Sequence, residues 1–287
     1  YMTNKQTDLF RSLIIKALFL NDFLADKLTL KGGSALDLIY NLTGRSSLDI
    51  DVALAEDFSS SDLFEIEGIL LKTLNDLFNE ENYTVFDLTF TKRPKIESNP
   101  RWGGYLVEFK IMEGIYSEEE ISKNLEKYRR CNSIPIGSSR KFKIDISKYE
   151  ATHNATNSNY DGIEINVYSL EMIVYEKIRA ICQQLPEYKY NMGHFKKSRL
   201  KDFYDIYKIV KNNHINRKRL NLRDLTEFFN AKEVPLELLN QISKYKEHFK
   251  EGESQLLETL TKEESTNYNF NTIFDYVINL IAEINHQ

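Results

Sequence analysis

Two aspartates that alternate along a short apolar stretch are the residues of this chain best suited to do chemistry. Asp49 and Asp51 flank Ile50 in DIDVAL, and side chains two positions apart on a strand point to the same face. Two neighbouring carboxylates repel each other and bind protons more readily unless a cation lies between them. Mg²⁺ suits this position, because it binds a few carboxylates and completes its shell with water and substrate phosphates. We therefore expect a magnesium or manganese site here.

A glycine turn precedes the aspartates in KGGSAL. Gly32 and Gly33 let the backbone approach a ligand without a Cβ in the way. If a helix begins at or near Ser34, its amides and the Ser34 hydroxyl can donate to an anion. An ordinary turn between a strand and a helix explains the glycines equally well. A phosphate cradle followed by a strand with paired carboxylates is nevertheless the layout of metal-dependent nucleotidyl transfer, in which two ions contact the attacking and leaving oxygens.

Periodicity predicts the elements that must hold these residues. Strands are predicted at 49–54, 83–92, 105–112, 141–147 and 162–169, and helices at 7–28 (capped by Thr7 or Asp8), 34–42, 60–82 and 117–130. The Asn-rich stretch 151–162 predicts a polar loop. Beyond residue 169 only helical periods follow, at 169–185, 198–213, 222–231, 236–249 and 271–284. We expect an α/β domain over 1–168 and a helical domain over 169–287.

Composition excludes several classes of protein. The chain has 287 residues, of which 41% are hydrophobic and 28% charged, as is ordinary for a globular protein. No apolar run approaches the roughly 20 residues that span a bilayer, and no basic-then-apolar leader is visible. Cys131 and Cys182 cannot form a disulfide framework and lack the paired spacing of a zinc site. We expect a cytoplasmic protein that does not associate with membranes.

Charge is distributed unevenly along the chain, although the net charge is only −5. Residues 123–148 contain 8 Lys and Arg against 2 Asp and Glu, and residues 186–223 contain 11 against 3. Such segments are typical of a footprint for a polyanion. They are also typical of solvated helix faces, and charge alone leaves both interpretations open.

The motifs together resemble those of a known family. KGGSAL followed by RSSLDID is similar to the AbiEii/AbiGii-type toxins of the DNA polymerase β-like nucleotidyltransferase superfamily. SLEMIVYEKIRAI resembles the family's helix with Glu-Lys-x-x-Ala, and RLKDFYDIYKI resembles its Arg/Lys-Asp-x-x-Asp helix. All of these motifs occur in order over residues 31–207. The resemblance implies an α+β fold, with a polymerase-β-like mixed sheet and helices followed by an all-helical C-terminal subdomain.

The resemblance and the residue types together assign candidate roles. Arg45 suits either a carboxylate or a phosphate, because both match the guanidinium fork. The metal ligands are then Asp49, Asp51 and Asp145. The nucleotide-binding residues are Lys31, Gly32, Gly33, Ser34, Arg45, Ser47 and Lys177. Catalytic roles fall to Asp49, Asp51, Asp145, Lys177 and Asp202.

Several roles stay open at this point. The superfamily needs a third carboxylate, and Asp145 on the polar face of KFKIDISK is a third metal ligand, the base that activates the acceptor hydroxyl, or a solvated aspartate. Lys177 is alternatively an exposed helix lysine. The longer connection before the second helix leaves open whether Asp202 or Asp205 is functional, and either could instead favour the helix dipole.

The predicted reaction moves a nucleoside monophosphate (NMP) from an NTP to an acceptor hydroxyl and releases pyrophosphate. The resemblance implies a toxin of a bacterial toxin–antitoxin pair in abortive phage infection, with an antitoxin encoded elsewhere. Related toxins add nucleotides to the 3′ end of tRNA and so block translation. A protein hydroxyl as acceptor, or a nucleotide-binding module without catalysis, are the alternatives. The residues do not identify the NTP, the acceptor, the mode of action of the antitoxin or the oligomeric state.

Overall fold

The computed structural model describes residues 3–42, 49–95, 101–136, 139–191, 195, 197–212 and 214–286. The chain forms two compact units. Unit 1 comprises Tyr1–Ser34, Ser47–Thr152 and Asn157–Val167, and unit 2 comprises Ala35–Ser46, His153–Thr156 and Tyr168–Gln287. The α+β prediction is confirmed, because a mixed sheet is combined with many helices. The domain boundary proposed between residues 168 and 169 stays a prediction.

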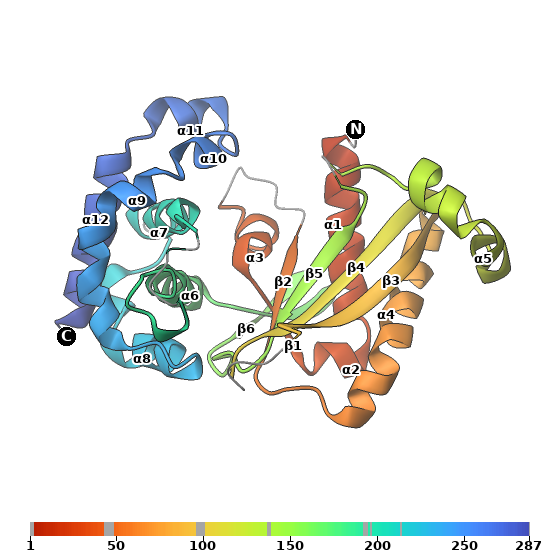
Figure 1. Cartoon of the computed structure of the whole chain (residues 1–287), viewed down its shortest axis with the longest axis horizontal. Helices are drawn as coiled ribbons and strands as arrows, with labels where there is room; N and C mark the ends of the chain where they lie inside the picture. Colours follow the sequence, from red (N-terminus) through yellow and green to blue (C-terminus); the bar gives the residue numbers. More distant parts are fainter. Residues whose placement is uncertain are drawn as a thin grey trace. The chain divides into compact units, whose positions relative to one another are not determined.

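A seven-stranded mixed sheet forms the centre of unit 1 (Figure 1). Its strands are β1 (Leu28–Lys31), β2 (Ile50–Leu54), β3 (Tyr83–Arg93), β4 (Gly104–Glu113), β5 (Phe142–Ser147), β6 (Thr156–Tyr160) and β7 (Ile163–Val167). Their order is β3-β4-β5-β2-β1-β7-β6. β2 pairs with β5 and β1 with β7 in parallel, whereas β1–β2, β3–β4 and β4–β5 are antiparallel. The strands that carry the predicted site, β1, β2 and β5, are therefore neighbours.

Helices cover unit 1 and join its strands. They are α1 (Asn4–Phe19), α2 (Asp22–Ala25), α4 (Ser60–Glu80), α5 (Glu118–Lys127) and the π-helix η1 (Tyr128–Asn132). A further helix, α3 (Gly32–Leu38), begins in unit 1 and continues into unit 2. α1 and α4 pack together and against the sheet, and the buried ring of Phe10 on α1 lies 5.5 Å from Phe78 and 5.7 Å from Phe142. This packing buries one face of β5 and leaves Asp145 on the other.

The start of the first helix differs from the prediction. Thr3, not Thr7 or Asp8, caps α1. The Thr3 hydroxyl accepts from the backbone N–H of Gln6, and the backbone N–H of Thr3 donates to Oε1 of Gln6. The helix predicted over 7–28 is also interrupted after Phe19, where Asn21 caps the separate helix α2. A capping box satisfies two backbone donors at once, and this explains why the earlier start is preferred.

Two further elements depart from the prediction. The helix expected from Ser34 begins at Gly32. A polar loop was expected at 151–162, but this stretch contains strand β6. The prediction is wrong here because the sequence of β6, TNSNY, has no alternation of apolar residues. β6 is the last strand of the sheet, and Asp161 and Gly162, with φ of 49° and 84°, match the Asp-Gly signal of a two-residue hairpin turn.

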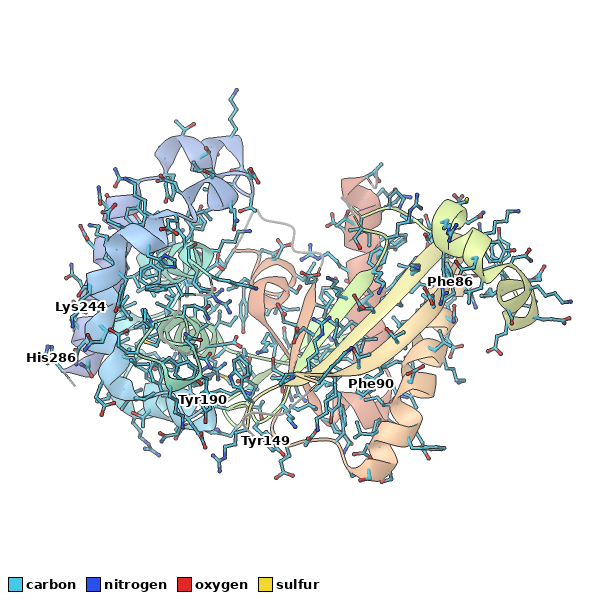
Figure 2. All side chains as sticks on the ribbon, in the orientation of Figure 1. Phe86, Phe90, Tyr149, Tyr190, Lys244 and His286 are labelled. Atoms are coloured by element: carbon cyan, nitrogen blue, oxygen red, sulfur yellow. The ribbon has the colours of Figure 1, made fainter. Side chains whose placement is uncertain are left out.

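A bulge in β3 attaches η1 to the sheet. Phe86 and Phe90 lie on this strand (Figure 2), and the pairing register with β4 shifts between Phe86 and Thr89. Asp87, inside the bulge with φ of 55°, accepts from Lys110 at 2.8 Å and from Arg129 at 2.5 Å. The bulge therefore places one carboxylate between two cations.

Unit 2 is built from helices around α6 (Figure 1). Its elements include the α-helices α6 (Leu170–Cys182), α7 (Leu200–Lys211), α8 (Leu222–Ala231), α9 (Lys246–Lys250), α10 (Glu253–Leu257), α11 (Lys262–Asn267) and α12 (Phe270–Asn285), and the 3₁₀ helices η2 (Lys189–Asn191), η3 (Arg217–Arg219) and η4 (Leu236–Tyr245). α6 packs against α7, α8 and η4. Within the described ranges, no helix is long and apolar enough to cross a membrane.

Candidate active site

A row of three residues crosses the centre of the sheet. Lys31 on β1 is the in-register partner of Asp51 on β2, and Asp51 is the in-register partner of Asp145 on β5. Side chains at paired positions point to the same face, on strands about 4.8 Å apart. The structure thus brings together the candidate residues Lys31, Asp51 and Asp145, which we call the charged row.

The glycine bend lies directly against this row. Gly32 follows Lys31 at the end of β1 and has φ of 68°, a conformation that favours glycine. A Cβ at Gly32 would lie 2.5 Å from Oδ2 of Asp51. A larger residue would therefore displace the carboxylate, and the proximity of the bend to Asp51 explains why glycine is needed here.

Ser34 and Asp49 join the bend to the start of β2. Ser34 is fully buried, and its hydroxyl donates to the backbone carbonyl of Asp49 at 2.8 Å. In this structure the hydroxyl, which the sequence suggested as a phosphate donor, therefore holds two parts of the site together. Asp49 itself is exposed. Two other candidates, Arg45 and Ser47, lie outside the described residues.

The pKa of Asp145 in the charged row is shifted. Although the residue is exposed at the surface, the protein atoms around its carboxyl remove part of its hydration and raise its pKa above the ordinary aspartate value. Lys31 and Arg93 act to lower this pKa, whereas the charges of Asp49 and Glu150 raise it further. Burial of the carboxyl is therefore the main cause of the raised pKa of Asp145.

A buried ion pair lies next to the row. Nζ of Lys31 is 3.4 Å from Oε1 of Glu150, and the two side chains are only 8% and 2% exposed. The sequence singles out neither Glu150 nor Arg93. Arg93 ends strand β3 and Glu150 follows strand β5, and neither residue belongs to a recognisable motif. The pairing of β3, β4 and β5 brings Arg93 near Asp145, and a backbone hydrogen bond from Glu150 to Leu54 at the end of β2 places Glu150.

The row fits a divalent cation by the nature of its donors. In the part of the chain that the structure describes, no cluster of three or more His, Cys, Asp or Glu side chains is arranged to hold a metal ion. Mg²⁺ needs only one or two carboxylates, since water and substrate phosphates complete its shell. Asp51 and Asp145 lie on paired positions, and the charge of Asp49 acts on Asp145. A divalent cation would relieve the repulsion between these carboxylates.

Unit 2 contains a second charged cluster. Nζ of Lys177 on α6 lies 2.9 Å from Asp202 and 2.8 Å from Asp205 on α7. The aspartates are three positions apart and share a helix face, so both contact Lys177. The sequence left open which of the two is functional. Lys177 is 8% exposed, which excludes its interpretation as an exposed helix lysine. Burial acts to lower the pKa of Lys177, but Asp202 and Asp205 raise it above the ordinary lysine value.

Ion pairs neutralise much of the two basic segments. In 123–148, paired cations include Lys123, Arg129, Arg130, Lys141 and Lys148. In 186–223, they include Lys189, Arg199, Lys208, Arg217 and Arg219. Most of their partners lie outside the segments, such as Asp57 for Lys148 and Glu264 for Lys208. The linear charge excess therefore overstates the positive surface.

The family of the chain follows from its sequence as a whole. Residues 14–275 match the family described as nucleotidyl transferase AbiEii toxin, type IV TA system. The chain belongs to the AbiEii family. It is therefore a nucleotidyltransferase and a toxin of a toxin–antitoxin system, and the alternative of a module without catalysis is set aside. Membership also implies an NTP substrate and an antitoxin partner.

One solved structure agrees with this fold. The chain is similar to a protein from H. pylori that is named as a nucleotidyltransferase, with 16% identity, a TM-score of 0.51, and 99% of this chain and 96% of that chain covered. An antigenic nucleotidyltransferase-like protein from Paracoccidioides brasiliensis has 16% identity and a TM-score of 0.39, with 86% and 93% covered. The antibiotic-resistance factor ANT(2'')-Ia has 13% identity and a TM-score of 0.36, with 85% of this chain and 100% of that chain covered. No curated protein matches the chain.

Proposed function

We propose that this AbiEii-family enzyme transfers an NMP from an NTP to the 3′ end of tRNA and thereby blocks translation. The observation that supports this most is the charged row, in which Asp51 and Asp145 occupy paired positions beside a glycine bend. Carboxylates on neighbouring strands next to a backbone that a triphosphate can approach are the equipment that nucleotidyl transfer needs.

Asp51 and Asp145, with Asp49, would hold Mg²⁺ or Mn²⁺. When bound, the ion supplies positive charge that stabilises the transferred phosphoryl group and the departing pyrophosphate. If Asp145 is instead the base that takes the proton of the acceptor hydroxyl, its raised pKa suits that role. Gly32 and Gly33 leave the backbone open to the triphosphate, and the Ser34 bond to the Asp49 carbonyl keeps the bend beside β2.

The remaining candidates keep the roles implied by the family motifs. Lys177 is proposed to bind nucleotide phosphates, and Asp202 and Asp205 fix the direction of its ammonium through two contacts under 3 Å. Arg45 and Ser47 are proposed as nucleotide contacts on their motif positions alone. We further propose a cytoplasmic location and a role in antiviral defence, because the substrate tRNA and the phage cycle are both found there.

Support for tRNA as acceptor comes from cations that have no ion-pair partner. Within the described residues, Lys201, Lys211, Lys218 and Arg223 of the segment 186–223 form no ion pair. Phosphate contacts by such side chains release counterions, so binding weakens as salt is added. We expect the affinity for tRNA to fall steeply between 50 and 200 mM salt, by about 10-fold or more if several of these cations contact phosphates.

Transfer assays test the proposal directly. The enzyme is incubated with Mg²⁺ and each of the four labelled NTPs, together with total tRNA, cell protein or no acceptor, and the products are separated on a gel. We expect label on tRNA with one NTP in preference to the others, and none with the Asp51→Asn variant. Label on protein instead would identify a protein NMP-transferase, and an absence of product with all acceptors would contradict the proposal.

A further inference from the structure

We propose that Arg93 is a further substrate-binding residue of this enzyme, which binds the phosphate next to the acceptor hydroxyl and so favours a nucleic-acid acceptor over a protein. The inference rests on the proposed function, because it names a contact to the acceptor of that same reaction. It concerns an arginine at the end of β3 that belongs to no recognisable motif of the sequence.

Strand register places Arg93 on the face of the sheet that carries the charged row. Arg93 is the in-register partner of Gly104 on β4, and Gly104 is the partner of Ser147 on β5. Ser147 follows Asp145 by two positions, and both paired positions and alternate positions of a strand share a face. Arg93 and Asp145 therefore lie on the same face, on strands that are two spacings, or roughly 10 Å, apart.

The backbone of Arg93 is held against the end of β5. Gly103 has φ of 108°, and a Cβ at this position would collide with the carbonyl oxygen of Arg93. The carbonyl of Gly103 in turn accepts from the amide of Lys148, directly after β5, at 3.1 Å. These contacts fix the end of β3 relative to the strand that carries Asp145.

The guanidinium of Arg93 is accessible to a ligand. Arg93 is exposed, and no acid among the residues that the structure describes forms an ion pair with it. Thr91, on the same face of β3, is exposed as well, so solvent reaches this part of the sheet. The charge of Arg93 acts on the carboxyl of Asp145, where it lowers the pKa against the larger effect of burial. A guanidinium in this position suits a phosphate, because its planar fork matches phosphate oxygens.

The order of the strands favours the acceptor over the NTP as the source of that phosphate. The glycine bend follows β1 and Arg93 ends β3, and the strands of Asp51 and Asp145 lie between them. In the proposed reaction the acceptor oxygen bonds to the α-phosphorus while the bond to pyrophosphate breaks, with the two oxygens roughly in line. A triphosphate at the glycine bend puts the pyrophosphate on the β1 side, and the acceptor then approaches from the side of β5 and Arg93.

The position of an anion beside the acceptor hydroxyl identifies the chemical class of the acceptor. In an RNA strand, the ribose with the terminal 3′ hydroxyl is joined through its 5′ oxygen to the last internucleotide phosphate. A hydroxyl of a protein side chain carries no such group. Arg93 therefore fits the 3′ end of a nucleic acid, and its contact adds affinity for that end.

Steady-state kinetics of the full chain test this assignment. In Arg93→Gln we expect KM for tRNA to rise about 10-fold, as is typical when one charge-assisted hydrogen bond is lost. KM for the NTP and kcat should stay at the values of the unchanged chain, because the contact is made equally before and during the reaction. An unchanged KM for tRNA, or a rise of KM for the NTP instead, overturns the proposal. The matched control Lys72→Gln removes a cation that is 79% exposed on α4 of the same unit, and both KM values should stay unchanged.

A modified acceptor locates the contact. We use tRNA whose last internucleotide phosphate is replaced by a neutral methylphosphonate. With the unchanged chain its KM should rise by the same factor of about 10, and Arg93→Gln should add no further rise, since both changes remove one contact. Additive effects would mean that Arg93 acts elsewhere and would overturn the proposal. An unchanged KM for the modified tRNA overturns it as well, even if Arg93→Gln does not fold.

Binding without NTP provides a readout that does not depend on turnover. Fluorescence anisotropy measures the affinity of the full chain for tRNA at several salt concentrations. In Arg93→Gln the slope of log affinity against log salt should be shallower by about 0.7, because one contact to a single-stranded phosphate is lost. Arg93→Lys keeps the charge but loses the fork, so the slope should be retained. A purely structural role of Arg93 would leave the slope unchanged in both variants.

Two outcomes distinguish failure of this inference from failure of the proposed function. Transfer to tRNA with an unchanged KM for tRNA in Arg93→Gln contradicts only the role of Arg93. Transfer to protein by the unchanged chain, or full activity of Asp51→Asn, contradicts the proposed function itself.

Discussion

The two charged clusters of this chain use aspartates in opposite ways. In unit 1, Asp51 and Asp145 lie at paired positions on neighbouring strands, and Asp145 is exposed with a raised pKa. In unit 2, Asp202 and Asp205 are buried and both contact Lys177 within 3 Å. The first cluster places two carboxylates side by side next to the buried Lys31, with Asp145 open to solvent, whereas the second buries two aspartates in direct contact with one lysine.

This difference indicates which cluster depends on a ligand. Gathered carboxylates cost folding free energy until a cation neutralises them, so their presence points to binding. A buried ion pair is internally satisfied, and breaking it leaves a desolvated charge without a partner. We therefore expect changes to the charged row to affect activity and changes to the Lys177 cluster to affect stability strongly as well.

The largest expected effect is the loss of activity in Asp51→Asn. The amide keeps the shape of the side chain but removes the charge of the proposed metal ligand, and we expect the transfer rate to fall by about 10³-fold or more. Pyrophosphate release with tRNA and NTP measures the rate. The unfolding midpoint in urea should stay equal to or above that of the unchanged chain, and a lower midpoint would contradict the comparison.

Next in size is the loss of stability in Lys177→Met. Removing one partner of a buried pair leaves Asp202 and Asp205 uncompensated, which typically costs about 3–5 kcal/mol. The exposed pair of Lys72 with Asp76, 79% and 63% exposed, offers a matched control, because Lys72→Met should change the free energy of unfolding by less than about 0.5 kcal/mol. Equal effects of the two variants on urea unfolding would remove the distinction between the clusters.

Magnesium should produce a smaller, selective stabilisation. At about ten times the dissociation constant, a bound ion adds roughly 1.4 kcal/mol, and this corresponds to a rise of about 3 °C in the unfolding temperature. Differential scanning fluorimetry with and without EDTA measures the shift. The rise should be absent in Asp51→Asn and retained in Lys72→Met, and a shift that persists in Asp51→Asn would place the ion elsewhere.

The smallest expected effect is a pH-dependent gain of stability in Asp145→Asn. Because the pKa of Asp145 is raised in the folded chain, its ionisation disfavours folding above that pKa, and this cost is absent below the ordinary aspartate value of about 3.9. Asp145→Asn should therefore be more stable than the unchanged chain at pH 8 without metal, and the difference should shrink toward pH 4.

Asp57→Asn should change the pH dependence of stability in the opposite direction to Asp145→Asn. Burial acts to raise the pKa of Asp57, but hydrogen bonds from Lys148 and Tyr105 lower it overall. Its stabilising contribution is present above the ordinary aspartate pKa and is lost as pH falls through the lowered value. Asp57→Asn should thus be less stable at pH 8, with a deficit that disappears in acid, as measured by urea unfolding at each pH.

Local patterns predicted the helices and strands well, and the errors have identifiable causes. Alternation in DIDVAL predicts β2 and places both aspartates near one strand, because a strand of period two needs only its own residues. The edge strand β6 was missed, since a polar strand at the edge of a sheet lacks an apolar face. The capping box of Thr3 and Gln6 starts α1 before its apolar periodicity begins, because a cap depends on polar side chains.

Charge partners were the weakest part of the sequence interpretation. The basic segments 123–148 and 186–223 suggested a positive surface, yet many of their cations pair with acids elsewhere in the chain, such as Lys208 with Glu264. Asp205 could not be separated from Asp202, because both lie on the same face of α7 and Lys177 contacts both. Such pairings depend on how distant segments pack, so linear charge counts do not reveal them.

The sequence alone determined the family, the α+β class and the candidates Asp49, Asp51 and Lys177, because these depend on residue types within motifs of a few positions. Only the tertiary structure decided that Asp145 is in register with Asp51 and that Glu150 reaches Lys31 across 119 positions. Strand order and register arise from packing free energy summed over the whole unit. No short stretch of residues contains that sum, and for this reason the charge balance of the site becomes visible only in the folded chain.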